Sequence, residues 1–80
     1  MRTADGTVDI DKDKLRLARL RAGLSMRGVT RRATQLGRKV DFANYSRYEK
    51  GERRPYPHTA AALAEVFGVD ITDLLKDDAA

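Results

Sequence analysis

The chain has 80 residues, 41% of them apolar, which suffices for one small domain with a single core. It has no cysteine, which excludes disulfides and thiolate metal sites, and no apolar run approaches the roughly 20 residues of a membrane span. The net charge of +4 is uneven, because residues 14–54 carry +10, residues 1–13 carry −2 and residues 55–80 carry −4. Such a basic middle segment suits either a polyanion-binding surface or a solvated face. We expect a cytoplasmic protein without a membrane anchor.

The first eleven residues show no helical period, so we expect a flexible N-terminal arm at 1–11, anchored only by Val8 and Ile10. A helical period begins at Lys12 and continues to Gly23, which has the position of a C′ residue. Two adjacent faces of this helix are apolar: one carries Leu15, Ala18 and Ala22, the other Leu17, Leu20 and Leu24. The second face either packs against the arm or forms a subunit contact.

Ser25 is the expected N-cap of a second helix with apolar residues at helical spacing. The stretch 34–40 interrupts this period, with Gly37 as the expected turning point and Val40 as a buried anchor. Asp41 then caps a short third helix that reaches about Lys50.

Gly51 ends the third helix, and Pro57 fits the first turn of a fourth helix that Gly68 closes. The apolar face expected for this fourth helix is Ala61, Leu63, Ala64 and Phe67. A capping box at 70–73 begins a fifth helix, and residues 77–80 form a frayed tail. The predicted fold class is therefore all-α, with five short helices.

Three motifs carry a family resemblance: LRLARLRAGLS at 15–25, YSRYEKGERRP at 45–55 and LAEVFGVDITDLL at 63–75. Together they resemble the lambda-repressor/Cro-like, or Xre-type, helix-turn-helix family of bacteria and phages, over a domain at 12–76. The resemblance implies that the second helix lies across the DNA backbone and the third enters the major groove. Residues 34–39 depart from the family pattern, because they lengthen the turn between these helices or extend the second helix.

The resemblance places Tyr45 and Tyr48 toward the core and the opposite face of the third helix toward the bases. The base-reading candidates are Arg47, Asn44, Ser46, Ala43 and Phe42. Arg47 suits a bidentate contact with guanine, and Asn44 suits adenine or a phosphate. Phe42 and Ala43 have no side-chain donors and suit at most a thymine methyl group. For Phe42, closing the core under the long turn is an equal alternative.

Phosphate contacts are expected from the start of the second helix and from the loop after the third. The candidates are Ser25, Arg27, Lys50, Arg53, Arg54, Arg38 and Lys39. For Arg38 and Lys39 a plain solvated charge is an equal alternative. The resemblance also implies that Arg19 and Glu49 form a structural ion pair between the first helix and the third.

Catalysis is not expected, because His58 is the single histidine and no carboxylate pair or nucleophilic arrangement converges. We likewise expect no cofactor and no metal. The predicted function is a sequence-specific, double-stranded DNA-binding transcriptional regulator, a repressor that binds as a homodimer and has no separate sensor domain. The alternatives are an antitoxin-type protein-interaction module that also binds DNA, and an RNA-binding protein.

Overall fold

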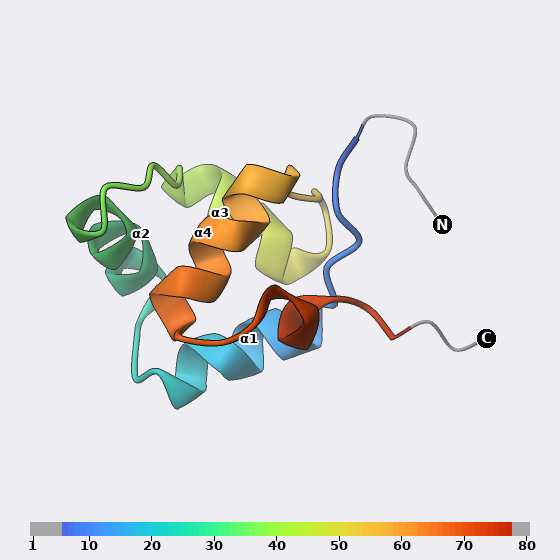
Figure 1. The fold of residues 1–80 in the computed structure, drawn as a ribbon, viewed down its shortest axis with the longest axis horizontal. Helices are drawn as coiled ribbons and strands as arrows, with labels where there is room; N and C mark the ends of the chain where they lie inside the picture. The colour runs from blue at the N-terminus through green and yellow to red at the C-terminus, as the bar shows by residue number, and fades with distance from the viewer. Residues whose placement is uncertain (1–5, 78–80) are drawn as a thin grey trace.

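The structure is a computed structural model that describes residues 6–77. Four α-helices and one 3₁₀ turn follow in chain order (Figure 1). Their bounds are α1 Lys12–Arg21, α2 Met26–Gln35, α3 Phe42–Lys50, α4 Pro57–Phe67 and η1 Ile71–Leu74. The described residues contain no strand beyond one isolated bridge, which confirms the all-α class.

The fifth predicted helix is a single 3₁₀ turn rather than an α-helix. Its capping box is present, since Asp70 accepts from Thr72 N–H and Asp73 accepts from Asp70 N–H. These backbone and hydroxyl donors of Thr72 also lower the pKa of Asp70. The turn stops at Leu74 because Leu75 is extended and forms an antiparallel bridge with Ile10.

The predicted helix boundaries rest on local hydrogen bonds that the structure contains. Ser25 Oγ accepts from Gly28 N–H at 3.0 Å, and Asp41 Oδ2 accepts from Asn44 N–H at 3.0 Å. Gly51 ends α3 in the left-handed region with φ of 76°, where a side chain would be strained. These three boundaries therefore follow from a residue and its neighbours within one turn.

The core forms where the helices meet around α4, which lies in the middle of the molecule in Figure 1. α3 packs against α1 and α2, whereas α4 packs against α2 and η1. Each element contributes a side chain with no exposed surface: Leu15, Val29, Tyr45, Leu63 and Leu74. Val40, the anchor expected between α2 and α3, is also buried.

The apolar face expected for α4 is wrong at one position. Ala61 is exposed and shares its side of the helix with Glu65, one turn later. The buried residues of α4 are Ala60, Ala62, Leu63, Ala64, Val66 and Phe67. The stripe is wider than expected because α4 is covered by α2 on one side and by η1 on another.

The connection between α2 and α3 is part helix and part turn. α2 continues through Gln35, and Gly37 then turns the chain with φ of 76°. Arg38 N–H returns to Ala33 C=O at 2.8 Å, which closes the end of the helix. Residues 34–39, which depart from the family pattern, therefore lengthen α2 and end it in a turn that leads to the buried Val40.

Residues 8–11 run beside the end of the chain. Val8 N–H donates to Pro55 C=O at 2.8 Å, Asp11 N–H to Leu74 C=O at 2.9 Å, and Lys76 N–H to Asp9 C=O at 3.0 Å. The two ends of the described chain consequently lie on one side of the molecule (Figure 1). The start of the predicted arm, residues 1–5, and most of the predicted tail, residues 78–80, lie outside the described residues.

Candidate nucleic-acid interface

Arg19 and Glu49 form a nearly buried ion pair between α1 and α3. Arg19 Nε lies 2.5 Å from Glu49 Oε2, and Nη2 lies 3.1 Å from Oε1. Their side chains are 13% and 8% exposed. Arg19 Nη1 also donates to Leu24 C=O at 3.0 Å, so its donors are directed inward. Arg19 is therefore held by the fold, as the resemblance implied.

Tyr45 completes this network because its hydroxyl donates to the same Glu49 carboxylate. Tyr45 is fully buried, and its ring meets that of Tyr48 edge-on at 6.4 Å between centroids. Burial raises the pKa of both tyrosines, and the hydrogen bond with Glu49 raises the pKa of Arg19. These contacts fix one face of α3 against the core, as predicted for both tyrosines.

The other side of α3 carries the five base-reading candidates. Arg47 and Ala43 are exposed, whereas Phe42, Asn44 and Ser46 are half-buried. Within residues 6–77 no carboxylate lies within ion-pair distance of Arg47, so its guanidinium is available to a ligand. Whether these side chains contact bases stays a prediction.

All seven phosphate-binding candidates are exposed: Ser25, Arg27, Lys50, Arg53, Arg54, Arg38 and Lys39. Two of them already have acidic partners. Arg38 Nε lies 2.8 Å from Glu65 Oε1 on α4, and Arg54 Nε lies 3.7 Å from Asp9 Oδ1 in the N-terminal segment. Both pairs are solvent-exposed, and such pairs are weak enough for a phosphate to replace the carboxylate.

The first turn of α2 retains donors that face solvent. Ser25 Oγ accepts from Gly28 N–H, which leaves the hydroxyl hydrogen free to be donated. Neither α2 nor α3 has an acidic residue in its first turn, and the Asp41 carboxylate is already engaged as the cap of α3. The positive end of the α2 dipole is thus not offset by an acidic side chain, whereas the Asp41 carboxylate lies at the positive end of α3.

Arg27 and Phe42 make a contact that the spacing of residues did not predict. The guanidinium carbon of Arg27 lies 4.3 Å from the centroid of the Phe42 ring, within the range of a cation–π interaction. Phe42 is outside the cluster of buried core residues, so the alternative that it closes the core is not what the structure shows. The two residues belong to different helices, which is why no pattern within one helix indicated the contact.

A family model described as "Helix-turn-helix domain" matches residues 13–76, which is most of the chain. The chain belongs to this helix-turn-helix family.

This helix-turn-helix chain is also similar to a protein of Pyrobaculum aerophilum named "Putative HTH-type transcriptional regulatory protein". The two are 41% identical over 70 residues, which cover 88% of this chain and 26% of that protein. The chain therefore spans about a quarter of the length of this relative. No solved structure matches the chain significantly.

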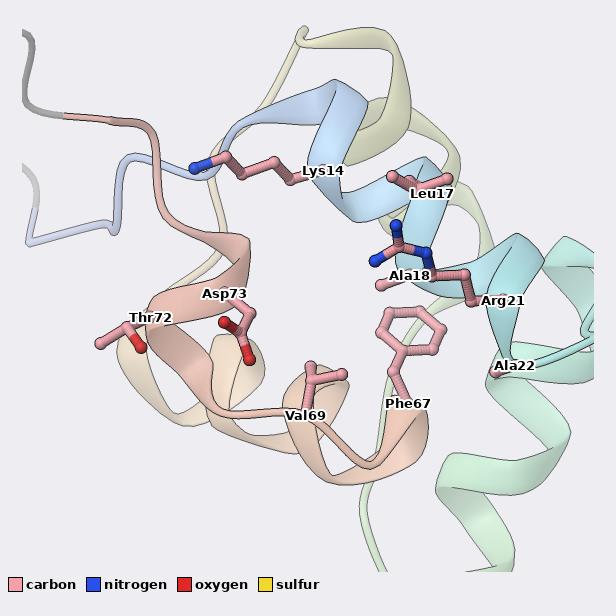
Figure 2. A pocket seen from close by; sticks show the side chains of 9 residues that line it. All are labelled: Lys14, Leu17, Ala18, Arg21, Ala22, Phe67, Val69, Thr72 and Asp73. Carbon is pink, nitrogen blue, oxygen red and sulfur yellow. The ribbon is translucent and has the colours of Figure 1, made fainter.

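A second surface of the helix-turn-helix domain lies between α1 and the connection from α4 to η1. It is a hollow of about 530 Å³ whose lining includes Leu17, Ala18 and Phe67. Figure 2 shows the Phe67 ring directed toward α1, where Ala18 and Arg21 face it, with Asp73 on the η1 side. Sequence reasoning missed this hollow because it joins residues that are far apart in the chain.

Leu17 and Leu20 are 45% and 52% exposed, so residues 6–11 do not cover them. The expectation that the arm packs on these leucines is therefore not met by its described part, in which Ile10 packs on the core instead. Within the described part of this helix-turn-helix domain, no helix is long and apolar enough to cross a membrane. The same residues contain no group of three or more His, Cys, Asp or Glu side chains placed to hold a metal ion.

Proposed function

We propose that this domain binds double-stranded DNA and regulates transcription, with α3 in the major groove. The observation that carries the proposal is the outer face of α3, where Asn44, Ser46 and Arg47 present polar groups away from a fixed core. Exposed cations follow at the end of the helix and in the next loop. The family and the name of the Pyrobaculum aerophilum relative support the same reading.

The proposed DNA recognition consists of contacts with bases and contacts with phosphates. Arg47 donates two hydrogen bonds to guanine O6 and N7, and Asn44 pairs with adenine or with a phosphate. Phosphates are contacted from the end of α3 by Lys50 and from the following loop by Arg53 and Arg54. The Arg19–Glu49 pair and the buried tyrosines hold α3 against α1, so the reading face is presented without rearrangement.

The proposal also covers the bounds of the DNA-binding unit, the location of the protein and its oligomeric state. Residues 12–76 are the DNA-binding unit, and residues 1–11 are an arm attached to it. The protein acts in the cytoplasm as a non-enzymatic repressor and binds inverted half-sites about one helical turn apart as a homodimer.

The test is selection of bound sequences from random duplex DNA with the parent protein and with Arg47→Ala. The parent is expected to select a defined motif. Arg47→Ala is expected to lose preference at one base position, by about 1–3 kcal/mol, while non-specific binding remains. Arg16→Ala, which removes an exposed arginine of α1 outside the interface, is the matched control and should keep the motif. A parent protein without any sequence preference would contradict the proposal.

The salt dependence of binding gives a second measurement. If about six phosphates are contacted, log K should fall against log salt concentration with a slope of about −5. Structured RNA added as competitor separates the nucleic acids, because displacement of duplex DNA by RNA would favour the RNA-binding alternative.

A protein-interaction role is favoured by one observation, the exposed Leu17 and Leu20 beside the hollow. We propose a second copy of this chain as the occupant of this surface. The rim carries charges of both signs, Arg21 and Asp73, so two copies related by a twofold axis can pair them reciprocally. Analytical ultracentrifugation with and without DNA tests this. Leu17→Ser with Leu20→Ser should abolish the dimer, and a parent strictly monomeric on DNA would exclude it.

A further inference from the structure

The contact between Arg27 and Phe42 joins the two helices of the helix-turn-helix at their N-terminal ends. Arg27 is the second residue of α2 and Phe42 is the first residue of α3. The guanidinium carbon lies 4.3 Å from the ring centroid. Arg27 is exposed and Phe42 is half-buried outside the core cluster, so the pair lies at the surface where the two helices approach each other.

The guanidinium of Arg27 carries five N–H donors, and the ring attracts it through its charge rather than by accepting all of these donors. Donors that do not face the ring remain available to a ligand. Within the described residues no carboxylate forms an ion pair with Arg27. The first turns of both helices also lack acidic side chains. Arg27 therefore lies over an aromatic ring and has no ion-pair partner within the described residues.

The contact also limits the roles that are open to the Phe42 ring. The ring face under Arg27 is covered, so that face is not available to a thymine methyl group. Phe42 does not belong to the buried cluster, so its ring is not needed to complete the core. The covered face of the ring therefore supports the arginine above it.

We propose that Phe42 is a positioning residue that holds Arg27 for contact with a phosphate of the DNA backbone. The inference rests on the proposed DNA binding and adds a role for Phe42 that is neither base reading nor core packing. Arg27 contacts the phosphate. Phe42 reduces the number of conformations that the Arg27 side chain adopts before it binds. The expected energetic signature is coupling: the ring matters for DNA binding only when Arg27 is present.

A double-mutant cycle with Arg27→Ala, Phe42→Leu and both changes tests this on a non-specific duplex at several salt concentrations. Arg27→Ala should reduce the magnitude of the salt slope by about 0.9, the value for one phosphate. Phe42→Leu should weaken binding roughly 2- to 5-fold, the range of one exposed cation–π contact, in the parent and leave the Arg27→Ala variant unchanged. Phe42→Tyr retains the ring and should restore parental affinity. Thermal unfolding of each variant confirms that binding is measured on folded protein.

Two outcomes of the binding measurements overturn the proposal while DNA binding itself stands. One is an equal effect of Phe42→Leu with and without Arg27, and the other is an unchanged salt slope in Arg27→Ala. The stack can also be observed without DNA, because the ring should shift the δ-proton resonances of Arg27 upfield in the free protein, and Phe42→Leu should remove that shift. Absence of the shift in the parent overturns the proposal as well. A parent that binds no duplex DNA overturns the proposed function and the phosphate role together.

Discussion

Arg19 and Arg27 lie in the same basic segment, and the fold uses them in opposite ways. Arg19 is 13% exposed and directs its donors to Glu49 and to Leu24 C=O. Arg27 is exposed, lies over the Phe42 ring and has no carboxylate partner among the described residues. Arg19 makes three hydrogen bonds inside the protein, whereas Arg27 is exposed and forms no ion pair within the described residues.

The comparison shows that net charge alone does not identify a binding residue. Burial of Arg19 is tolerable only because Glu49 matches its charge and Tyr45 supplies a further donor to that carboxylate. Arg27 needs no such compensation because it remains in water. The opposite side of α3, rather than this network, is the region where a polyanion can find free donors.

The largest effect is expected from Glu49→Gln, which removes the charge that compensates Arg19. The free energy of unfolding should fall by about 3 kcal/mol, because a nearly buried guanidinium loses its counter-charge. Urea denaturation followed by circular dichroism measures this loss. Glu52→Gln, at an exposed position nearby, is the control and should change stability by less than about 0.5 kcal/mol. A loss below about 1 kcal/mol for Glu49→Gln would mean that the two arginines differ less than their burial indicates.

A second prediction uses the pH dependence of stability. Burial raises the pKa of Tyr45 above its ordinary value of 10.0, so the folded state retains a proton that the unfolded chain releases. Stability should therefore be unaffected well below pH 10 and should fall above it, by up to about 1.4 kcal/mol per pH unit.

Tyr45→Phe tests the source of this alkaline loss. The variant should be less stable by about 1 kcal/mol at pH 7, because Glu49 loses one hydrogen-bond donor. Its unfolding free energy should also depend less on pH above 10. Tyr48→Phe is the comparison, since burial raises the pKa of Tyr48 as well. An unchanged alkaline profile in Tyr45→Phe would place the loss at another group.

The smallest effect is expected at Arg38, which has an acidic partner, as Arg19 has, but is exposed, as Arg27 is. Its ion pair with Glu65 is about half exposed on both sides, so Arg38→Gln should cost less than about 1 kcal/mol of stability. Glu65→Gln should release Arg38 and strengthen binding to duplex DNA slightly if Arg38 contacts a phosphate. Titrations at low and high salt distinguish this from no contact, for which both variants should leave the salt slope unchanged.

Much of the fold was predictable because its boundaries depend on neighbours within one turn. Ser25 and Asp41 accept from amide groups three residues ahead, and Gly51 permits a left-handed backbone. The face of α4 was less predictable, because a helix rich in alanine has no sharp period to separate Ala61 from Ala60 and Ala62. The base and phosphate contacts remain predictions, since side-chain exposure is compatible with them but does not test them.

The sequence by itself determined four α-helices, the caps Ser25 and Asp41, and the family resemblance, because spacing within one turn and ordered motifs encode these features. The tertiary structure decided which charges remain free. It joined Arg38 to Glu65, Arg54 to Asp9 and Arg27 to Phe42, and it ended η1 early through the bridge between Ile10 and Leu75. These contacts connect residues on separate elements, so they arise only when packing of the core brings those elements together.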